Sequence, residues 1–485
     1  MLEASTQAMM AIAGGLRARK QEASTETPRM RRCRQALMLS SVPDTLPESG
    51  NDMRSAFVSA HLRAHHHDHA LHHETIKHSI RDLPIGWSEL NLASRDIAAH
   101  SIELHFSLAP RDQASLEAEL AETSDPDHPR WRQHLTRDQV DAFRRPKELT
   151  VRSLESFLKG HGLHNIRYSS DGTIASIKTS VQKADSMLKA KFRMFQHKSG
   201  SKVLRTRSYE LPDHLAAHIR SVQPTTFFGN HLVKRKPVTA PPIRELQERD
   251  LAPVSTEYPE SCRNLSSVPW DCLRRVYQTD DYIVKRPGTN AVGIVAFLNE
   301  TALHSDAVLL ANLERPSAAG YAARFSVEAW GGASDEQVLN KATLEAEDDQ
   351  EGNMDAQTVL MMTHPLQFNF YTVGGRGLWK PDANENTNGN EPYQIALAHL
   401  LALPDDQLPR VLSFSYADDE QATPRGYAAA TCEQFGALAA RGVSIFFSAG
   451  DGGTAGAATN CEINDGSRRE AILATFPATC PYVTV

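Results

Sequence analysis

Five apolar-rich runs, separated by helical segments, dominate the second half of the chain. The runs cover residues 291–299, 323–331, 366–374, 410–418 and 443–451, and the helical patterns cover 353–364, 391–404 and 426–442. Strands that are apolar on both faces and alternate with helices are typical of a parallel sheet. The pattern therefore predicts an α/β domain with its functional loops at the carboxyl ends of the strands.

A smaller unit with a different pattern of apolar residues precedes this domain. Residues 101–109 alternate as a strand, and residues 166–180 form a hairpin around Asp171-Gly172. The remaining elements are predicted helices at 113–123, 151–163 and 181–192 and predicted strands at 193–198 and 203–211. This mixture predicts an antiparallel α+β unit of the split β-α-β, ferredoxin-like type.

Changes in composition divide the 485 residues into four segments. Residues 1–80 are polar and rich in histidine, and we expect a disordered or leader segment there. Residues 81–232 form the predicted α+β unit. Residues 233–260 are basic and proline-rich, which favours an exposed linker with a processing site at Lys234-Arg235-Lys236. Residues 261–485 hold the predicted α/β domain.

The charge balance excludes two classes of partner. The formal net charge is −7 with histidine neutral, and no single-sign field favours nucleic acid or a membrane surface. No apolar run reaches the length needed to span a membrane. Protonating all 21 histidines against 52 basic and 59 acidic residues changes the net charge to +14. We therefore expect a protein that responds strongly to mild acid.

The N-terminus does not encode an ordinary export signal. Its apolar stretch precedes the basic cluster, and Glu3 lies where a signal peptide carries positive charge. Two glycosylation-type sequons, at Asn264 and Asn299, favour an exported protein. We therefore expect a secreted or extracellular protein without a convincing signal peptide.

Six cysteines stand at residues 33, 262, 272, 432, 461 and 480. Their spacing matches no zinc-binding pattern. The two close pairs, Cys262 with Cys272 and Cys461 with Cys480, predict short disulfide loops, and unpaired thiols at these positions are the equal alternative.

A histidine-rich stretch lies at residues 61–78, with six histidines at 65, 66, 67, 69, 72 and 73. Such a group could ligate a transition metal. A solvated segment, disordered or helical, is the simpler interpretation, because a metal site also needs a fold that holds its ligands.

Three acidic residues lie where chemistry is expected. Glu351 and Asp355 are four residues apart at the start of a predicted helix, so both carboxyls project from one face. Asp451 ends the apolar run 443–451 and is surrounded by glycines that allow a tight turn. Each position also has a structural interpretation, because acids in a first turn complement the helix macrodipole and Asp-Gly commonly ends a strand.

These acids belong to a set of segments that resembles the sedolisins, the serine-carboxyl peptidases that include the tripeptidyl-peptidases. The segments are the helix with Glu351 and Asp355, RVLSFSYADDE, ARGVSIFFSAGDGG and ATFPATCPYVTV, in that order. The α+β unit is similar to the activation prodomain of the family in LPIGWSELNLAS, HLTRDQVDAF and YELPDHLAAHIRSVQPTTFF. The resemblance runs from about residue 80 to Val485, and it implies a subtilisin-like parallel sheet preceded by a ferredoxin-like prodomain.

Carried over position by position, the resemblance implies a role for each acid. Glu351 is the general base that takes the proton of the attacking serine, and Asp355 is the acid that orients Glu351 and shares its proton. Asp451, when protonated, donates a hydrogen bond to the tetrahedral intermediate. A carboxylate is a weak base for an alcohol at neutral pH, so the resemblance implies work in acid and joint titration of Glu351 and Asp355.

The substrate-lining strand is implied to end at Ser415, Tyr416 and Ala417, where the family usually has Ser-Tyr-Gly. Alanine weakens substrate binding if residue 417 must adopt a glycine-like φ or if its methyl group meets the substrate. Met354 replaces a leucine between the two helix acids, which is a volume-conserving exchange.

The nucleophilic serine and the calcium loop of the family both follow the strand that residues 482–485 begin. Neither segment is in this sequence, and no other serine stands in a nucleophile-type turn. We therefore expect an incomplete, truncated catalytic domain that is inactive alone. Calcium is expected only for the complete family domain, and no metal site is expected in this chain.

Three functional hypotheses follow. The first is a sedolisin-type acid peptidase zymogen, either an endopeptidase or a tripeptidyl aminopeptidase, with peptides or proteins as substrates and its own prodomain as intramolecular partner. The second is a non-catalytic inhibitor or folding partner of an intact peptidase. The third is a metal-binding protein that uses the histidine-rich stretch.

Overall fold

The computed structural model describes most of the chain from residue 77 onward. The described residues are 77–80, 83, 87–92, 97–169, 171–197, 202–226, 260–263, 268–288, 290–339, 349–379, 389–456, 461–464, 467 and 469–485. The histidine-rich stretch, apart from its last two residues, and the linker expected at 233–260, apart from its last residue, lie outside the described residues.

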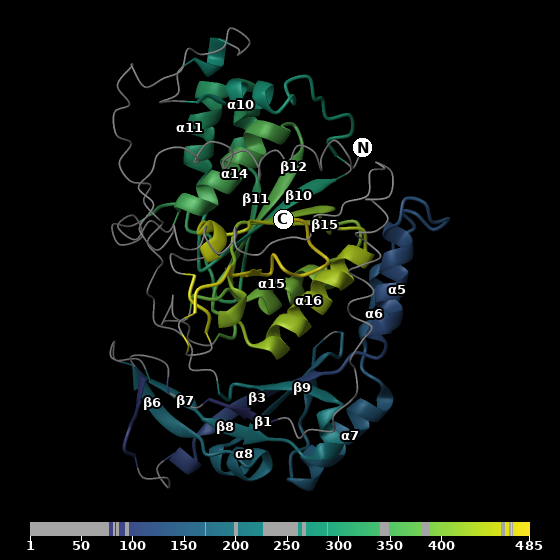
Figure 1. The fold of residues 1–485 in the computed structure, drawn as a ribbon, viewed down its shortest axis with the longest axis vertical. Helices are drawn as coiled ribbons and strands as arrows, with labels where there is room; N and C mark the ends of the chain where they lie inside the picture. Colours follow the sequence, from purple (N-terminus) through teal and green to yellow (C-terminus); the bar gives the residue numbers. More distant parts are fainter. Residues whose placement is uncertain are drawn as a thin grey trace.

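A five-stranded parallel sheet forms the centre of the larger, α/β unit (Figure 1). Its strand order is β11-β12-β10-β13-β15, so the first strand in the sequence is the middle strand of the sheet. All neighbouring strands are parallel. Buried apolar side chains on these strands form the main core, as the apolar runs predict. The strands are β10 Ala291–Phe297, β11 Ser326–Trp330, β12 Gln367–Val373, β13 Val411–Phe414 and β15 Ser444–Phe447.

Helices cover both faces of the parallel sheet, as crossovers between parallel strands require. α11 (His304–Glu314) and α14 (Gln350–Thr363) lie on one face, and α15 (Tyr393–Ala402) and α16 (Arg425–Ala440) lie on the other (Figure 1). Within the described part of the chain, no helix combines the length and apolarity needed to cross a membrane. The smaller elements are α10 Trp270–Val276, α12 Ala319–Ala322, β14 Asp418–Asp419, β16 Thr475–Phe476 and the 3₁₀ turns Glu260–Cys262, Pro316–Ala318, Glu420–Ala422 and Gly453–Ala455.

The N-terminal unit consists of antiparallel strands and short helices around its own apolar core. Its largest sheet has the order β4-β5-β3-β9, and β2-β6-β7 and β1-β8 form two smaller sheets. The strands are β1 Lys77–Ser79, β2 Trp87–Glu89, β3 Ser101–Leu108, β4 Arg167–Tyr168, β5 Ile174–Ser180, β6 Arg193–His197, β7 Lys202–Arg205, β8 Ser208–Glu210 and β9 Ile219–Gln223. The helices are α5 Gln113–Ser124, α6 Arg137–Arg144, α7 Glu148–Gly160, α8 Val181–Leu188 and α9 Asp213–Ala216.

The predicted fold class, a parallel α/β sheet preceded by an antiparallel α+β unit, is confirmed. Several details differ from the prediction. The single strand predicted at 203–211 is two strands, β7 and β8, which belong to different sheets. β13 ends at Phe414, earlier than predicted, because the next residues turn towards α14 and then pair separately as β14. The last residues make an isolated parallel bridge beside β15, in which Thr484 N–H donates to the Ile445 carbonyl at 2.8 Å.

One predicted disulfide is confirmed and the other is wrong. Cys262 pairs with Cys272 as predicted. Cys480 pairs with Cys432 on α16 rather than with Cys461. The fold brings the Cα atoms of Cys432 and Cys480 to 5.7 Å across 48 residues, so spatial proximity rather than sequence proximity decides this pair. Cys461 is also disulfide-bonded.

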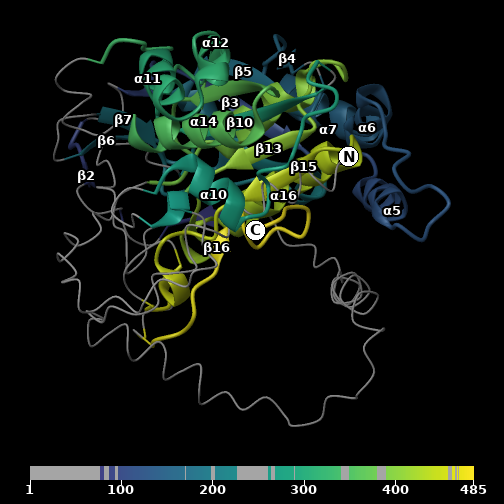
Figure 2. The same ribbon diagram turned by 90° about the horizontal axis from the view of Figure 1, so that it is seen from above.

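Helices α5 and α6 of the N-terminal unit lie beside α16 of the α/β unit (Figure 2). The amide of Leu135 donates to the Ala440 carbonyl at 2.9 Å, and Arg220 forms an ion pair with Glu433 at 2.9 Å. Three apolar residues of the N-terminal unit belong to the main core of the α/β unit, namely Leu116, Leu135 and Val140. The two units therefore share a core as well as polar contacts.

Asp405, in the loop after α15, joins the two units electrostatically. Its carboxylate accepts hydrogen bonds from the Arg137 amide, at the start of α6, at 3.0 and 3.2 Å. The same carboxylate accepts from the guanidinium of Arg441 at 2.7 and 3.0 Å. The Arg441 side chain is fully buried and also donates to the Leu401 and Leu403 carbonyls.

Thr136 caps the N-terminus of α6 at this interface, and we expect Thr136→Ala to cost about 1 kcal/mol of unfolding free energy. Its hydroxyl accepts from the Gln139 amide, and the Gln139 side chain accepts from the Thr136 amide at 2.8 Å. Chemical denaturation measures the loss. Lys147→Ala is the matched control, because Lys147 holds the same position on α7 without a side-chain cap. Equal effects of the two substitutions would contradict the capping argument.

Candidate active site

The start of α14 is held against the loop that follows β10. A Cβ atom added to Gly352 would lie 2.2 Å from the Thr301 carbonyl oxygen, so only glycine allows this approach of the two backbones. The side chain of the next residue, Asn353, accepts from the Leu303 amide at 2.8 Å. These contacts place the first turn of α14 at the carboxyl edge of the parallel sheet.

This first turn carries Glu351, and Asp355 follows one turn later. Burial raises the pKa of Glu351 to about 7, and the negative charge of Asp451 contributes to the rise. Burial, followed by the charge of Glu351, raises the pKa of Asp355 well above its usual value. The structure therefore brings together the two acids that the sequence places on one helix face, in a setting that favours protons on both.

Ser415 meets the two acids from the end of β13. Its hydroxyl donates to Asp355 Oδ1 at 2.8 Å. The same side chain also lowers the pKa of Glu351 and so opposes part of the effect of burial. The next two residues, Tyr416 and Ala417, are both buried, so their side chains do not line an open surface in this structure.

Asp451 is exposed in the turn between β15 and the 3₁₀ turn Gly453–Ala455. Its charge acts on Glu351, which places the two carboxyls in one electrostatic site. β13 and β15 are adjacent parallel strands, so the residues that follow them lie at the same edge of the sheet as the start of α14. The site therefore combines the buried acids Glu351 and Asp355, a serine hydroxyl that donates to Asp355, and the exposed acid Asp451.

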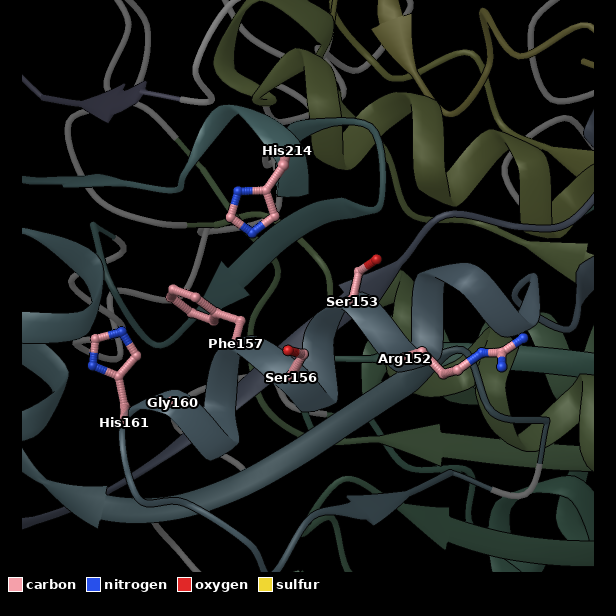
Figure 3. A pocket seen from close by; sticks show the side chains of 7 residues that line it. All are labelled: Arg152, Ser153, Ser156, Phe157, Gly160, His161 and His214. Atoms are coloured by element: carbon pink, nitrogen blue, oxygen red, sulfur yellow. The ribbon is translucent and has the colours of Figure 1, made fainter.

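Among the described residues, no group of three or more histidine, cysteine or acidic residues could hold a metal ion. A shallow surface pocket of about 490 Å³ lies on α7 of the N-terminal unit, and its lining includes Arg152, Phe157, His161 and His214 (Figure 3).

Comparisons with known proteins agree with this architecture. The profile of the family described as "Pro-kumamolisin, activation domain" matches residues 86–228. "Probable tripeptidyl-peptidase SED3" of Arthroderma benhamiae is 33% identical over 418 residues, which cover 85% of this chain and 66% of that protein. "Probable tripeptidyl-peptidase SED2" of the same fungus is 30% identical over 416 residues, with the same coverage of both chains. "Tripeptidyl-peptidase sed4" of Aspergillus fumigatus is 30% identical over 415 residues, covering 84% and 65%.

The chain belongs to the sedolisin family. It spans just under two thirds of the length of the relatives named above. The N-terminal unit corresponds to the activation domain of this family, and the α/β unit corresponds to the part of the relatives that follows it.

Two differences from the usual sedolisin motifs have clear structural settings. Ala417 is not among the residues with positive φ, so the alanine does not force a glycine-like backbone conformation. Met354 is 43% exposed, so its exchange for leucine disturbs no packed core.

The sequence analysis missed two acids at this sedolisin site. Glu300 accepts from the Gly352 amide at 3.4 Å, and its charge adds to the rise in the pKa of Asp355. Glu391 is 3% exposed and accepts from the Tyr393 hydroxyl at 2.8 Å, and its charge acts on Tyr416. Glu300 follows the carboxyl end of β10 just as Asp451 follows β15, and this position was the available signal.

Proposed function

We propose that this sedolisin is the zymogen of a serine-carboxyl peptidase that cleaves peptides in acid. The observation that carries the proposal is the buried pair of Glu351 and Asp355 at the carboxyl edge of the sheet, with the pKa of Glu351 raised to about 7. A carboxylate with a raised pKa is a stronger base for a serine hydroxyl. The tripeptidyl-peptidase names of the relatives favour release of tripeptides over internal cleavage.

The three acids divide the work of the reaction. Glu351, ionised, takes the proton of the attacking serine hydroxyl, while Asp355 holds the proton that the pair shares. Asp451, protonated, donates a hydrogen bond to the oxyanion of the tetrahedral intermediate. Protonation of Glu351 removes the base, so we expect the rate to fall on the acid side of the pKa of this carboxyl.

The attacking serine is the part of the proposal to test first. The native transcript is sequenced beyond the codon for Val485, where the proposal expects a Gly-Thr-Ser segment and an aspartate-rich calcium loop. The encoded protein is then assayed in acid with peptides whose N-termini are free or acetylated. Tripeptide release from the free peptides alone supports a tripeptidyl-peptidase, and equal cleavage of both supports an endopeptidase. A transcript that ends at Val485 would overturn the peptidase proposal and favour an inhibitor or folding partner.

The zymogen is proposed to act outside the cell, where its α+β unit covers the enzyme until the linker is cut. Acid release is supported by His134, whose ring packs against Gly442 after α16. The Nδ1 atom of His134 is buried and has no hydrogen-bond partner among the described residues. Burial, followed by the charges of Arg410 and Arg132, lowers the pKa of His134 below its usual 6.5.

The sign of this shift makes docking of the two units weaker in acid. The pKa of His134 is lower when the units are docked, so separated units bind the proton more tightly. The contribution of neutral His134 is complete above pH 6.5 and is lost as the pH falls through that value. Glu433 has the opposite effect on docking, because burial raises its pKa above the usual 4.5 despite the charge of Arg220. The pH range in which Glu433 changes docking starts at 4.5, below the value of 6.5 for His134.

We therefore expect His134→Gln to keep the two units docked to a lower pH than the wild-type chain. Hydrogen exchange of the Leu135 amide, which donates to Ala440, measures docking between pH 7.5 and 5 after correction with an unfolded reference peptide. His164→Gln, at an exposed histidine of the same unit, is the control and should behave like wild type. Identical pH dependence in all three proteins would refute the role of His134.

A further inference from the structure

The side chain of Ser415 has a setting that a substrate-lining role does not explain. Its hydroxyl donates to Asp355 Oδ1 at 2.8 Å, and Glu351 lies one turn earlier on the same helix, where Ser415 lowers its pKa. Ser415 is 60 residues from Asp355 in sequence, so this contact joins the end of β13 to α14. The hydroxyl is half-buried, which limits competition from water for this hydrogen bond.

A serine hydroxyl has one proton to donate and two lone pairs that accept. It can donate to Asp355 while it accepts from a protonated Glu351, or it can donate to Glu351 while it accepts from a protonated Asp355. Transfer of the Glu351 proton to the serine oxygen, together with transfer of the hydroxyl proton to Asp355, exchanges the two arrangements. One hydroxyl is therefore sufficient to connect the two carboxyls in a single hydrogen-bonded chain.

The groups around this chain explain why a neutral bridge is useful. Glu300 follows β10 and Asp451 follows β15, and the charge of each acts on one of the two carboxyls. The phenol of Tyr416 is buried near the same acids. Negative charges surround the pair, so the ionised form depends on hydrogen-bond donors. Ser415 supplies one such donor, which lies on Asp355 in this structure, and its side chain lowers the pKa of both carboxyls.

We propose that Ser415 is a positioning residue whose hydroxyl bridges Glu351 and Asp355, fixes their orientation and passes one proton between them. The role of the pair as general base rests on the proposed function. The bridge itself does not, because it concerns proton binding by two carboxyls that are both in this chain.

The test is a titration of the full 485-residue chain with ¹³C-labelled glutamate and aspartate carboxyls, followed by NMR. The variants are Ser415→Ala, Ser415→Cys, which keeps the shape and weakens the donor, and Ser415→Thr, which keeps the hydroxyl. Ser413→Ala is the matched control, because Ser413 is also half-buried, lies in β13 and is not a hydrogen-bond partner of either carboxyl.

We expect Ser415→Ala and Ser415→Cys to raise the titration midpoints of Glu351 and Asp355 by about one pH unit, as loss of a hydrogen bond to a charged group requires. Ser415→Thr and Ser413→Ala should titrate like wild type. If Ser415→Ala does not fold, the comparison of the cysteine and threonine variants decides. Equal midpoints in the cysteine and threonine variants would overturn the proposal.

The outcome is separable from that of the proposed function. The titration needs no substrate. Shifted midpoints in a protein that cleaves no peptide would therefore support the Ser415 bridge and contradict the peptidase proposal. If the protein cleaves peptides but Ser415→Ala does not change the midpoints, only the proposal of the Ser415 bridge is contradicted.

Discussion

Glu351→Gln is expected to lower peptide hydrolysis in acid by about 10²- to 10⁴-fold, the range that general-base catalysis contributes. The amide keeps the shape of the side chain but has no basic oxygen that takes a proton from a serine. Its place in the first turn of α14, near Ser415, is otherwise compatible with glutamine. The measurement is kcat/KM from pH 3 to 7 for the protein translated from the complete native transcript.

Two controls make the result specific. Glu328→Gln removes an exposed carboxyl from the edge strand β11 and should leave kcat/KM unchanged. The same Glu351→Gln variant should also lower the titration midpoint of Asp355, because the charge of Glu351 is one cause of the raised pKa of Asp355. Full activity in Glu351→Gln would show that another group is the base, whatever happens to Asp355.

Arg441→Ala is expected to cost about 3 kcal/mol of unfolding free energy, which is a large part of the stability of an ordinary domain. The fully buried guanidinium donates to the Leu401 and Leu403 carbonyls and to Asp405. Truncation leaves two carbonyls and one carboxylate without this donor. The estimate lies at the low end of the range for buried ion pairs because the side chain of Asp405 is 38% exposed and water replaces part of the loss.

Chemical denaturation measures this cost, and two variants separate its origins. Arg152→Ala removes an arginine that is 69% exposed and paired only at the surface of α7, so it should change stability by less than about 1 kcal/mol. Arg441→Met restores apolar volume without the donors, so a loss as large as that of Arg441→Ala assigns the effect to hydrogen bonds. A neutral Arg441→Ala would contradict a stabilising role for this guanidinium, which bonds Asp405 at the link to the Arg137 amide.

That link should persist in mild acid, where the contact at His134 weakens. Burial opposes ionisation of Asp405, but the hydrogen bonds from Arg137 and Arg441 outweigh it and lower the pKa below the usual 3.8. The stabilisation by ionised Asp405 is complete above pH 3.8 and is lost only as the pH falls through the lowered value. In the proposed acid release of the N-terminal unit, we therefore expect other contacts to be lost before this one.

Apolar patterning predicted the five strands of the parallel sheet and the helices α14, α15 and α16, because each is encoded within a short window of residues, but it did not predict α11. β10 and β12 differ from their predicted ranges by two residues or fewer at each end. β13 was predicted too long. Ser415 stands between apolar residues in the sequence, which is typical of a strand, but in the fold its hydroxyl donates to Asp355 on α14 and the strand has already ended. Glu300 was missed because its importance depends on the helix that packs against it rather than on its own neighbours in the chain.

By itself the sequence determined the parallel α/β class, the antiparallel unit before it and the two acids on one helix face, since these depend on local periodicity. The tertiary structure alone decided that Cys480 pairs with Cys432 and that Ser415 meets Asp355. It also decided the raised pKa of Glu351. The physical reason is that burial and contacts between distant segments arise only when the whole chain packs, and no window of sequence contains them.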